Sequence, residues 1–386
     1  MMQITLKYGL SVYAPSAVAQ FGAILSMYLE ERIERKYKDV ALLLLNESSE
    51  KRQGSIVYLV IYTLIDYWFE HISFTIEPLR SAYKMGRESG INDSAFQAAI
   101  SYCYNSFFIG NQLTHLNEDM KEIRRELPLA YVGFESLNAT VEVFLGIHPN
   151  DQRFNIDSCA IKSSKVKSTY NLICILRAYY FHEYESAATL IDESKLLYKE
   201  FHVGSCHYQY FIFYSGLVAL SMAKKEERFY WLQIATEHIS LIRLWSNVVP
   251  ENFENKQALL EAEMSAVLGK KDEAKRLFEK AIYLSEKHCF INEAALSNER
   301  AGIFCIESNS SCNSSENPSP FLSKALELYA KWEADAKVRH INSLYSAYIS
   351  QNPNTSEGDA QVLLNNLEVR PDLCSEISDE LSLFSL

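Results

Sequence analysis

The sequence predicts an all-α protein, built as an α-solenoid of antiparallel helical hairpins. Glycine (13) and proline (9) are scarce in a chain of 386 residues, whereas a β-rich or α/β protein of this size needs more turn residues. Apolar residues recur at helical spacing rather than in strict alternation. The chain is also long for one compact core, but it is a natural length for a stacked array of hairpins in which each hairpin contacts only its neighbours.

The clearest hairpin spans residues 259–287 and turns at Gly269, because glycine tolerates the positive φ that a helix stop requires. Ala274, Phe278 and Ala281 follow on one face of the second helix. A small, a large and a small residue at this spacing is the packing pattern of a tetratricopeptide second helix. The alternative is an ordinary helical hairpin in a globular protein.

A second copy of the pattern favours the repeat. His182 stands at a turn, and Ala187, Ile191 and Ser194 follow with the same spacing as in the first copy. The separation between the copies leaves room for about two further hairpins of roughly 34 to 45 residues each.

The remaining helices are predicted from apolar periodicity and from start and stop signals. Ser11 and Pro15 mark the first start, Gly90 and Gly110 mark stops, and Pro128 separates two helices. The predicted helices span residues 15–32, 37–46, 56–74, 76–89, 95–109, 113–125, 132–145, 168–181, 185–200, 208–223, 227–245, 292–307, 320–332 and 336–349.

Two segments break the helical pattern. Residues 307–319 are polar and of low complexity, and they predict a disordered loop insertion between two helices of one hairpin. Residues 351–386 predict an acidic flexible tail. The domain prediction is therefore one helical-repeat region at 1–350, followed by the tail.

The net charge of −12 and the pI near 5.3 argue against a nucleic-acid partner, which requires a basic stripe. The eight cysteines form no CxxC pair, which is typical of small buried residues in a reducing compartment. The apolar run 56–65 is too short to cross a bilayer, and the first residues lack the apolar core of a signal peptide. These observations predict a cytoplasmic protein without a membrane span.

Few residues suggest chemistry. His202, Cys206 and His207 lie close in sequence, but a metal site needs three or four convergent ligands, and only His202 and Cys206 share a helical face. Glu261 and Glu263 diverge by about 200° on a helix and cannot act as a carboxylate pair. We therefore predict no catalytic, cofactor-binding or metal-binding residue.

Glu299 and Arg300 are interpreted as a structural ion pair or cap. Tyrosine is abundant and clustered, with the clusters at Tyr179, Tyr180, Tyr208, Tyr210 and Tyr214. Aromatic residues at helical spacing are usually core, and the alternative is a concave groove that binds peptides or partner domains.

The chain resembles the tetratricopeptide-like middle region of large multidomain signalling kinases. The residues that carry the resemblance are Thr5–Ser11 with Tyr13 and Pro15, Tyr102–Leu113, Asn252–Phe253, Leu259–Glu263, Ala281–Ile282, Glu293–Leu296, Asn298–Arg300, Tyr329, Trp332, Ala334 and Ala336–Val338. Glu333 and Asp335 depart from the pattern, where glycine and a small neutral residue are expected, and the insert is longer than the usual turn.

In the resembling proteins, a serine/threonine-kinase-like domain and an AAA-type ATPase precede the helical region, and a GAF sensor and a histidine kinase follow it. No GxxxxGK[ST] motif and no HRD or DFG set occurs in this sequence, so their activities do not transfer. The resemblance implies a non-catalytic scaffold that couples neighbouring domains or docks proteins, as a fragment or truncated relative of a sensor kinase. The alternatives are a stand-alone peptide- or protein-binding adaptor and, third, an enzyme with its site in the middle of the chain.

Overall fold

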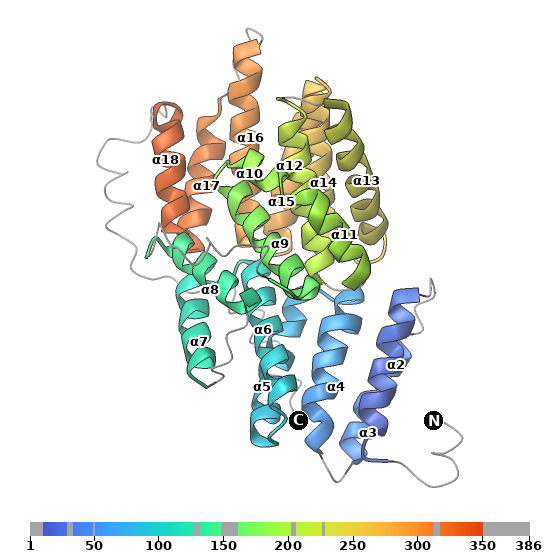
Figure 1. The fold of residues 1–386 in the computed structure, drawn as a ribbon. Coiled ribbons are helices and arrows are strands. Elements are labelled where there is room, and N and C mark those ends of the chain that lie inside the picture. The colour runs from blue at the N-terminus through green and yellow to red at the C-terminus, as the bar shows by residue number, and fades with distance from the viewer. Residues whose placement is uncertain are drawn as a thin grey trace.

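The structure is a computed structural model that describes residues 11–28, 34–48, 51–126, 132–147, 161–201, 206–225, 228–311 and 317–349. Every regular element in these ranges is a helix, and they contain no strand, so the all-α prediction is confirmed. The helices form two groups that meet end to end (Figure 1). The predicted tail at 351–386 lies outside the described residues.

The first group contains α2 to α8. Their bounds are Ala14–Tyr28 (α2), Glu34–Glu47 (α3), Gly54–Val60 (α4), Ile76–Glu88 (α5), Asn92–Ile109 (α6), Leu113–Glu126 (α7) and Val132–Leu145 (α8). The predicted glycine stops are confirmed, because Gly90 follows α5 with φ 73° and Gly110 ends α6 with φ 83°.

The single helix predicted at 56–74 is wrong. The chain leaves α4 through a π-helical turn and two 3₁₀ turns, which end at Thr75. The side chain of Asn252 binds the backbone at this break. It donates to the carbonyls of Tyr67 (3.1 Å) and Glu70 (3.0 Å) and accepts from the Ile72 amide (2.9 Å). Tertiary hydrogen bonds therefore replace the helical ones, which an apolar run does not reveal.

The second group contains α9 to α18. Their bounds are Ser164–Tyr180 (α9), Tyr184–Ala188 (α10), Ile191–Phe201 (α11), Cys206–Met222 (α12), Arg228–Ser246 (α13), Pro250–Val267 (α14), Lys271–Lys287 (α15), Ile291–Ser311 (α16), Ser319–Lys331 (α17) and Asp335–Ile349 (α18). The helix predicted at 185–200 is two helices, α10 and α11. The helices α12 to α17 form three successive hairpins, packed side by side (Figure 1).

The predicted loop insert at 307–319 begins too early. The helix α16 continues to Ser311, and its last turns have partners on two other hairpins. Lys224 Nζ donates to Glu307 Oε2 (2.8 Å), and Lys271 Nζ donates to the Ser308 carbonyl (3.2 Å). These contacts extend the helix into the low-complexity sequence. Residues 312–316 lie outside the described part of the chain.

The repeat packing pattern is confirmed in both copies. Ala274 and Ala281 are fully buried and Phe278 is 2 % exposed. In the other copy the equivalent residues Ala187, Ile191 and Ser194 are also buried. The turns match as well, because His182 (φ 62°) occupies the left-handed conformation that Gly269 (φ 76°) adopts.

The two groups of helices share one apolar core, which extends from Tyr67 to α18, whereas α2 to α4 pack around a smaller core of their own. The rings of Phe108 on α6 and Tyr210 on α12 stack at 3.7 Å between centroids, and Phe107 lies 5.5 Å from Trp332. The Asn292 side chain at the start of α16 donates to the carbonyls of Phe107 (3.3 Å) and Phe108 (3.2 Å). The first group thus covers one end of the repeat helices.

Candidate functional site: a buried charge network in the repeat helices

Three ion pairs are buried between the first helices of successive hairpins, α14, α16 and α18. Each of the six side chains is at most 4 % exposed. The pairs are Lys256–Glu293, Arg300–Glu263 and Lys337–Glu299. Buried charges occur in proteins only when they are paired and hydrogen-bonded, so each pair ties one hairpin to the next.

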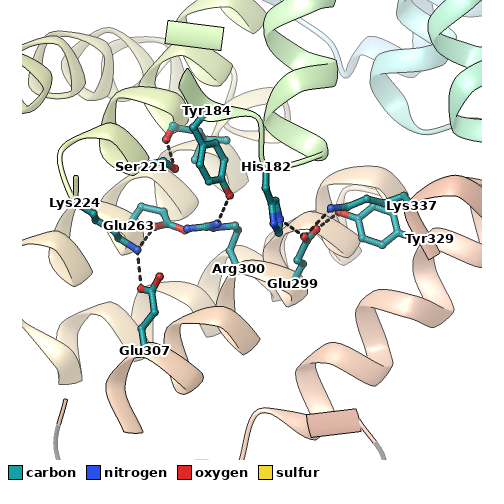
Figure 2. A network of polar contacts seen from close by, with 11 residues as sticks. His182, Tyr184, Ser221, Lys224, Glu263, Glu299, Arg300, Glu307, Tyr329 and Lys337 are labelled. Carbon is teal, nitrogen blue, oxygen red and sulfur yellow. Dashed lines mark hydrogen bonds and ion pairs between the residues drawn. The ribbon is translucent and has the colours of Figure 1, made fainter. Parts of the chain in front are cut away.

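Glu299 is the centre of the network (Figure 2). Its Oε1 accepts hydrogen bonds from Lys337 Nζ and His182 Nε2, each at 2.7 Å, and its Oε2 accepts one from the Tyr329 hydroxyl at 2.7 Å. Burial alone raises the pKa of this carboxyl, but the Lys337 ammonium and the bond from His182 outweigh burial and hold the pKa well below its usual range. Glu299 is therefore ionised, and both of its oxygens are occupied.

Arg300 forms the second half of the network, on the next position of α16 (Figure 2). Its Nε donates to Glu263 Oε1, and its Nη1 donates to the Tyr184 hydroxyl (3.0 Å). Lys224 approaches the other oxygen of Glu263 at 3.7 Å. Burial raises the pKa of Glu263, but Arg300 and Lys224 overcome that effect, so the pKa lies below its ordinary value.

The network also joins helices that are far apart in the sequence. His182 and Tyr184 belong to the turn between α9 and α10, yet they bind residues of α16. Lys337 of α18 also donates to the Tyr180 carbonyl at the end of α9. In an open solenoid each hairpin contacts only its neighbours. Here side chains also link the α9–α10 turn to α16 and α18, and we call this arrangement the closed stack.

Among the described residues, the network leaves one carboxylate oxygen without a partner, Glu293 Oε1, which is buried beside Lys256. Its other two carboxylates are fully bound. A catalytic acid or base must have a free atom that can exchange a proton with a substrate. Both carboxylate oxygens of Glu299 and of Glu263 are instead in hydrogen bonds or ion pairs with side chains of the protein. Within the described ranges, no group of three or more His, Cys, Asp or Glu side chains is arranged to hold a metal ion. In the same ranges no helix has both the length and the apolar character needed to cross a membrane.

The residues singled out by sequence are dispersed. His202 lies outside the described residues, while Cys206 is buried and its Sγ lies 3.4 Å from Asn105 Oδ1. Glu261 pairs with Arg243 (2.7 Å) on the surface, whereas Glu263 points inward, as their predicted divergence requires.

Glu299 and Arg300 are in ion pairs, as the sequence indicated, but each pairs with another helix. The structure also identifies Lys337 and Lys256 as members of buried ion pairs and His182 as a hydrogen-bond partner of Glu299, roles that the sequence did not assign to them. A signal for Lys256 and Lys337 exists: each stands 37 or 38 positions before or behind an acidic residue, close to one repeat length.

Four of the five clustered tyrosines are core, whereas the fifth, Tyr208, is partly exposed and lines a groove. Tyr179, Tyr180, Tyr210 and Tyr214 are at most 1 % exposed, so the aromatic groove considered as the alternative is not open at these four residues. Tyr180 lies 6.0 Å from the ring of Tyr214, and the hydroxyls of the two residues are 3.3 Å apart. The interior that an open solenoid offers to a peptide is filled here by its own side chains.

A buried histidine on α13 predicts sensitivity to acid. His238 is 1 % exposed, and burial, followed by nearby Lys195, lowers its pKa from 6.5 to about 3. A group with a depressed histidine pKa stabilises the fold above about pH 6.5 and loses that contribution as pH falls toward the folded value. From pH 6 to 4 this residue should lower the unfolding free energy by up to about 1.4 kcal/mol per pH unit. Unfolding free energies measured in urea at several pH values should fall less steeply with falling pH in His238→Phe than in the unsubstituted chain. An equal pH dependence in the two would contradict the assignment.

The repeated hairpins and their packing pattern define the class: a tetratricopeptide-type helical-repeat protein. Residues 143–351, more than half of the chain, match the family described as CHK1-like, TPR repeats, and the chain belongs to that family. The match covers α9 to α18 and the end of α8. A search of curated proteins found no match.

Proposed function

We propose that the chain is a non-catalytic coupling region of a multidomain signal-transduction protein. The observation that carries the proposal is the closed stack, in which Glu299 joins α16 to both the α9–α10 turn and α18. A body whose distant hairpins share buried charges moves as a unit, because packed interfaces change between discrete arrangements rather than deform gradually. Kinase-like, ATPase, GAF sensor and histidine kinase domains are its proposed neighbours, by resemblance, and the cytoplasm is its proposed location.

A stand-alone adaptor that binds a peptide in its concave face has less support. The aromatic side chains that such a groove needs are buried at Tyr180, Tyr210 and Tyr214. An enzyme has less support still, because the two central carboxylates of the network, Glu299 and Glu263, are already bound by side chains of the protein.

Hydrogen exchange tests the coupling. Lys337→Met on α18 should raise amide exchange in residues 182–188, which lie on the opposite side of the Glu299 contact, more than it raises exchange in α13. Unchanged exchange at 182–188 would contradict coupling through the network.

A turnover assay tests the non-catalytic part of the proposal. The purified chain should neither hydrolyse ATP nor transfer phosphate, since phosphate binding needs a glycine-rich loop at a helix N-terminus and a positioned lysine. Turnover that follows the chain through a sizing column and disappears on a point substitution in it would overturn this part.

A further inference from the structure

A groove between α11 and α13, with α12 beneath it, has no part in the charge network. Its volume of about 740 Å³ is within the range of small-molecule sites, roughly 300 to 1,000 Å³. It is lined by Lys195, Tyr208, Phe211, Ile212, Thr236, Glu237, His238, Ser240, Leu241 and Leu244. Tyrosine, phenylalanine, isoleucine and two leucines make half of this lining apolar.

Most polar groups in the lining already have partners. The Thr236 and Ser240 hydroxyls donate to carbonyls one turn earlier in α13, at 2.7 and 2.8 Å. Lys195 of α11 pairs with Glu237 of α13 at 2.8 Å. These four groups therefore demand nothing from a ligand. Tyr208 is partly exposed, so water can bind its hydroxyl, and His238 is left as the lining residue with a buried polar atom that lacks a partner.

His238 supplies an unused hydrogen-bond acceptor. The Ser215 hydroxyl gives its one hydrogen to the Phe211 carbonyl (2.5 Å), so its 3.1 Å contact with His238 Nδ1 requires that Nδ1 be the donor. The lowered pKa keeps the ring neutral, so Nε2 carries no proton. Nε2 is buried without a hydrogen-bond partner. A buried acceptor left in this state costs free energy that a donor would recover.

We propose that this groove binds a small, flat, apolar molecule with a single hydrogen-bond donor, such as an indole-type heterocycle, whose N–H binds His238 Nε2. The apolar lining takes the rings, and the lone acceptor fixes their orientation. An extended peptide fits less well, because its backbone would bring several donors and acceptors against apolar walls. Since His238 is 1 % exposed and its Nε2 is buried, the proposal requires the groove side chains to move slightly outward when the molecule binds.

Two probes that differ at one ring position test the proposal on the full chain: indole, and 1-methylindole, in which a methyl group replaces the N–H hydrogen. By titration calorimetry, indole should bind about five- to tenfold more tightly, as expected for one neutral hydrogen bond. His238→Phe should keep the affinity for 1-methylindole and lose the preference for indole. Equal affinities for the two probes in the unsubstituted chain, or no binding of indole, would overturn the proposal. This test needs only the unsubstituted chain, so it holds even if His238→Phe fails to fold.

Two substitutions of exposed leucines test whether the probes bind in the groove. Leu244→Arg puts a charge in the groove and should weaken both probes at least tenfold, whereas Leu268→Arg, at another exposed leucine outside the groove, should change neither affinity. If both substitutions have the same effect, the probes bind elsewhere and the proposal fails. The groove proposal and the coupling proposal are tested independently, because the groove has no part in the charge network.

Discussion

Lys337→Met is expected to lower the free energy of unfolding by about 3 to 5 kcal/mol, the usual cost of removing one partner from a buried ion pair. Lys337 is fully buried, and its ammonium lies 2.7 Å from Glu299 Oε1. Without it the Glu299 carboxylate keeps only His182 and Tyr329 as donors. Urea unfolding at pH 7 measures the change.

The matched control is Lys324→Met on the neighbouring helix α17. Lys324 also pairs with a glutamate, Glu327 at 2.8 Å, but the two side chains are 40 % and 61 % exposed. An exposed pair contributes at most about 1 kcal/mol. Adding Glu299→Gln to Lys337→Met removes the uncompensated charge and should restore part of the lost stability. Equal effects of the two lysine substitutions would show that the Glu299 pair is not buried.

Phe278→Ala is expected to cost about 3 to 5 kcal/mol, because it removes a large ring from the packed interface between α15 and α16. Phe278 is 2 % exposed and its ring centroid lies 5.3 Å from that of Phe304. Ala274 and Ala281 are fully buried on the same face and make room for the ring. The loss should appear as a lower midpoint of urea unfolding, with the slope of the transition unchanged.

Tyr283→Ala on the same helix is the control for Phe278→Ala. Tyr283 is 63 % exposed, so its removal should change stability by no more than about 0.5 kcal/mol. If Tyr283→Ala costs as much as Phe278→Ala, the predicted orientation of α15 is wrong.

The helices could be predicted where local signals are strong. The bounds of α8 agree with the predicted 132–145, and α6 stops at Gly110, because apolar periodicity and a residue with positive φ are both local features. The inward face of α15 followed in the same way from the spacing of Ala274, Phe278 and Ala281. The tetratricopeptide-type repeat was predicted from the same pattern, and the family match at residues 143–351 agrees with it.

The break after α4 and the closed stack could not be predicted, because they depend on partners far away in sequence. Asn252 binds the backbone of Tyr67, some 185 positions earlier, and His182 binds Glu299, 117 positions later. Periodicity records which face of a helix is apolar, but not which distant polar group lies opposite. A lysine such as Lys337 therefore suggests a solvated face, until its buried partner is known.

The most direct test of the closed stack is a double-mutant cycle between His182 and Glu299. His182→Gly suits the left-handed conformation at φ 62° and removes the side chain, and Glu299→Gln keeps the shape but removes the charge. Unfolding free energies of both single variants and of the double variant give the interaction energy. A closed stack predicts a coupling of about 0.5 to 3 kcal/mol, as for residues in contact, whereas additivity within about 0.5 kcal/mol would mean that His182 and Glu299 do not interact and would contradict the closed stack.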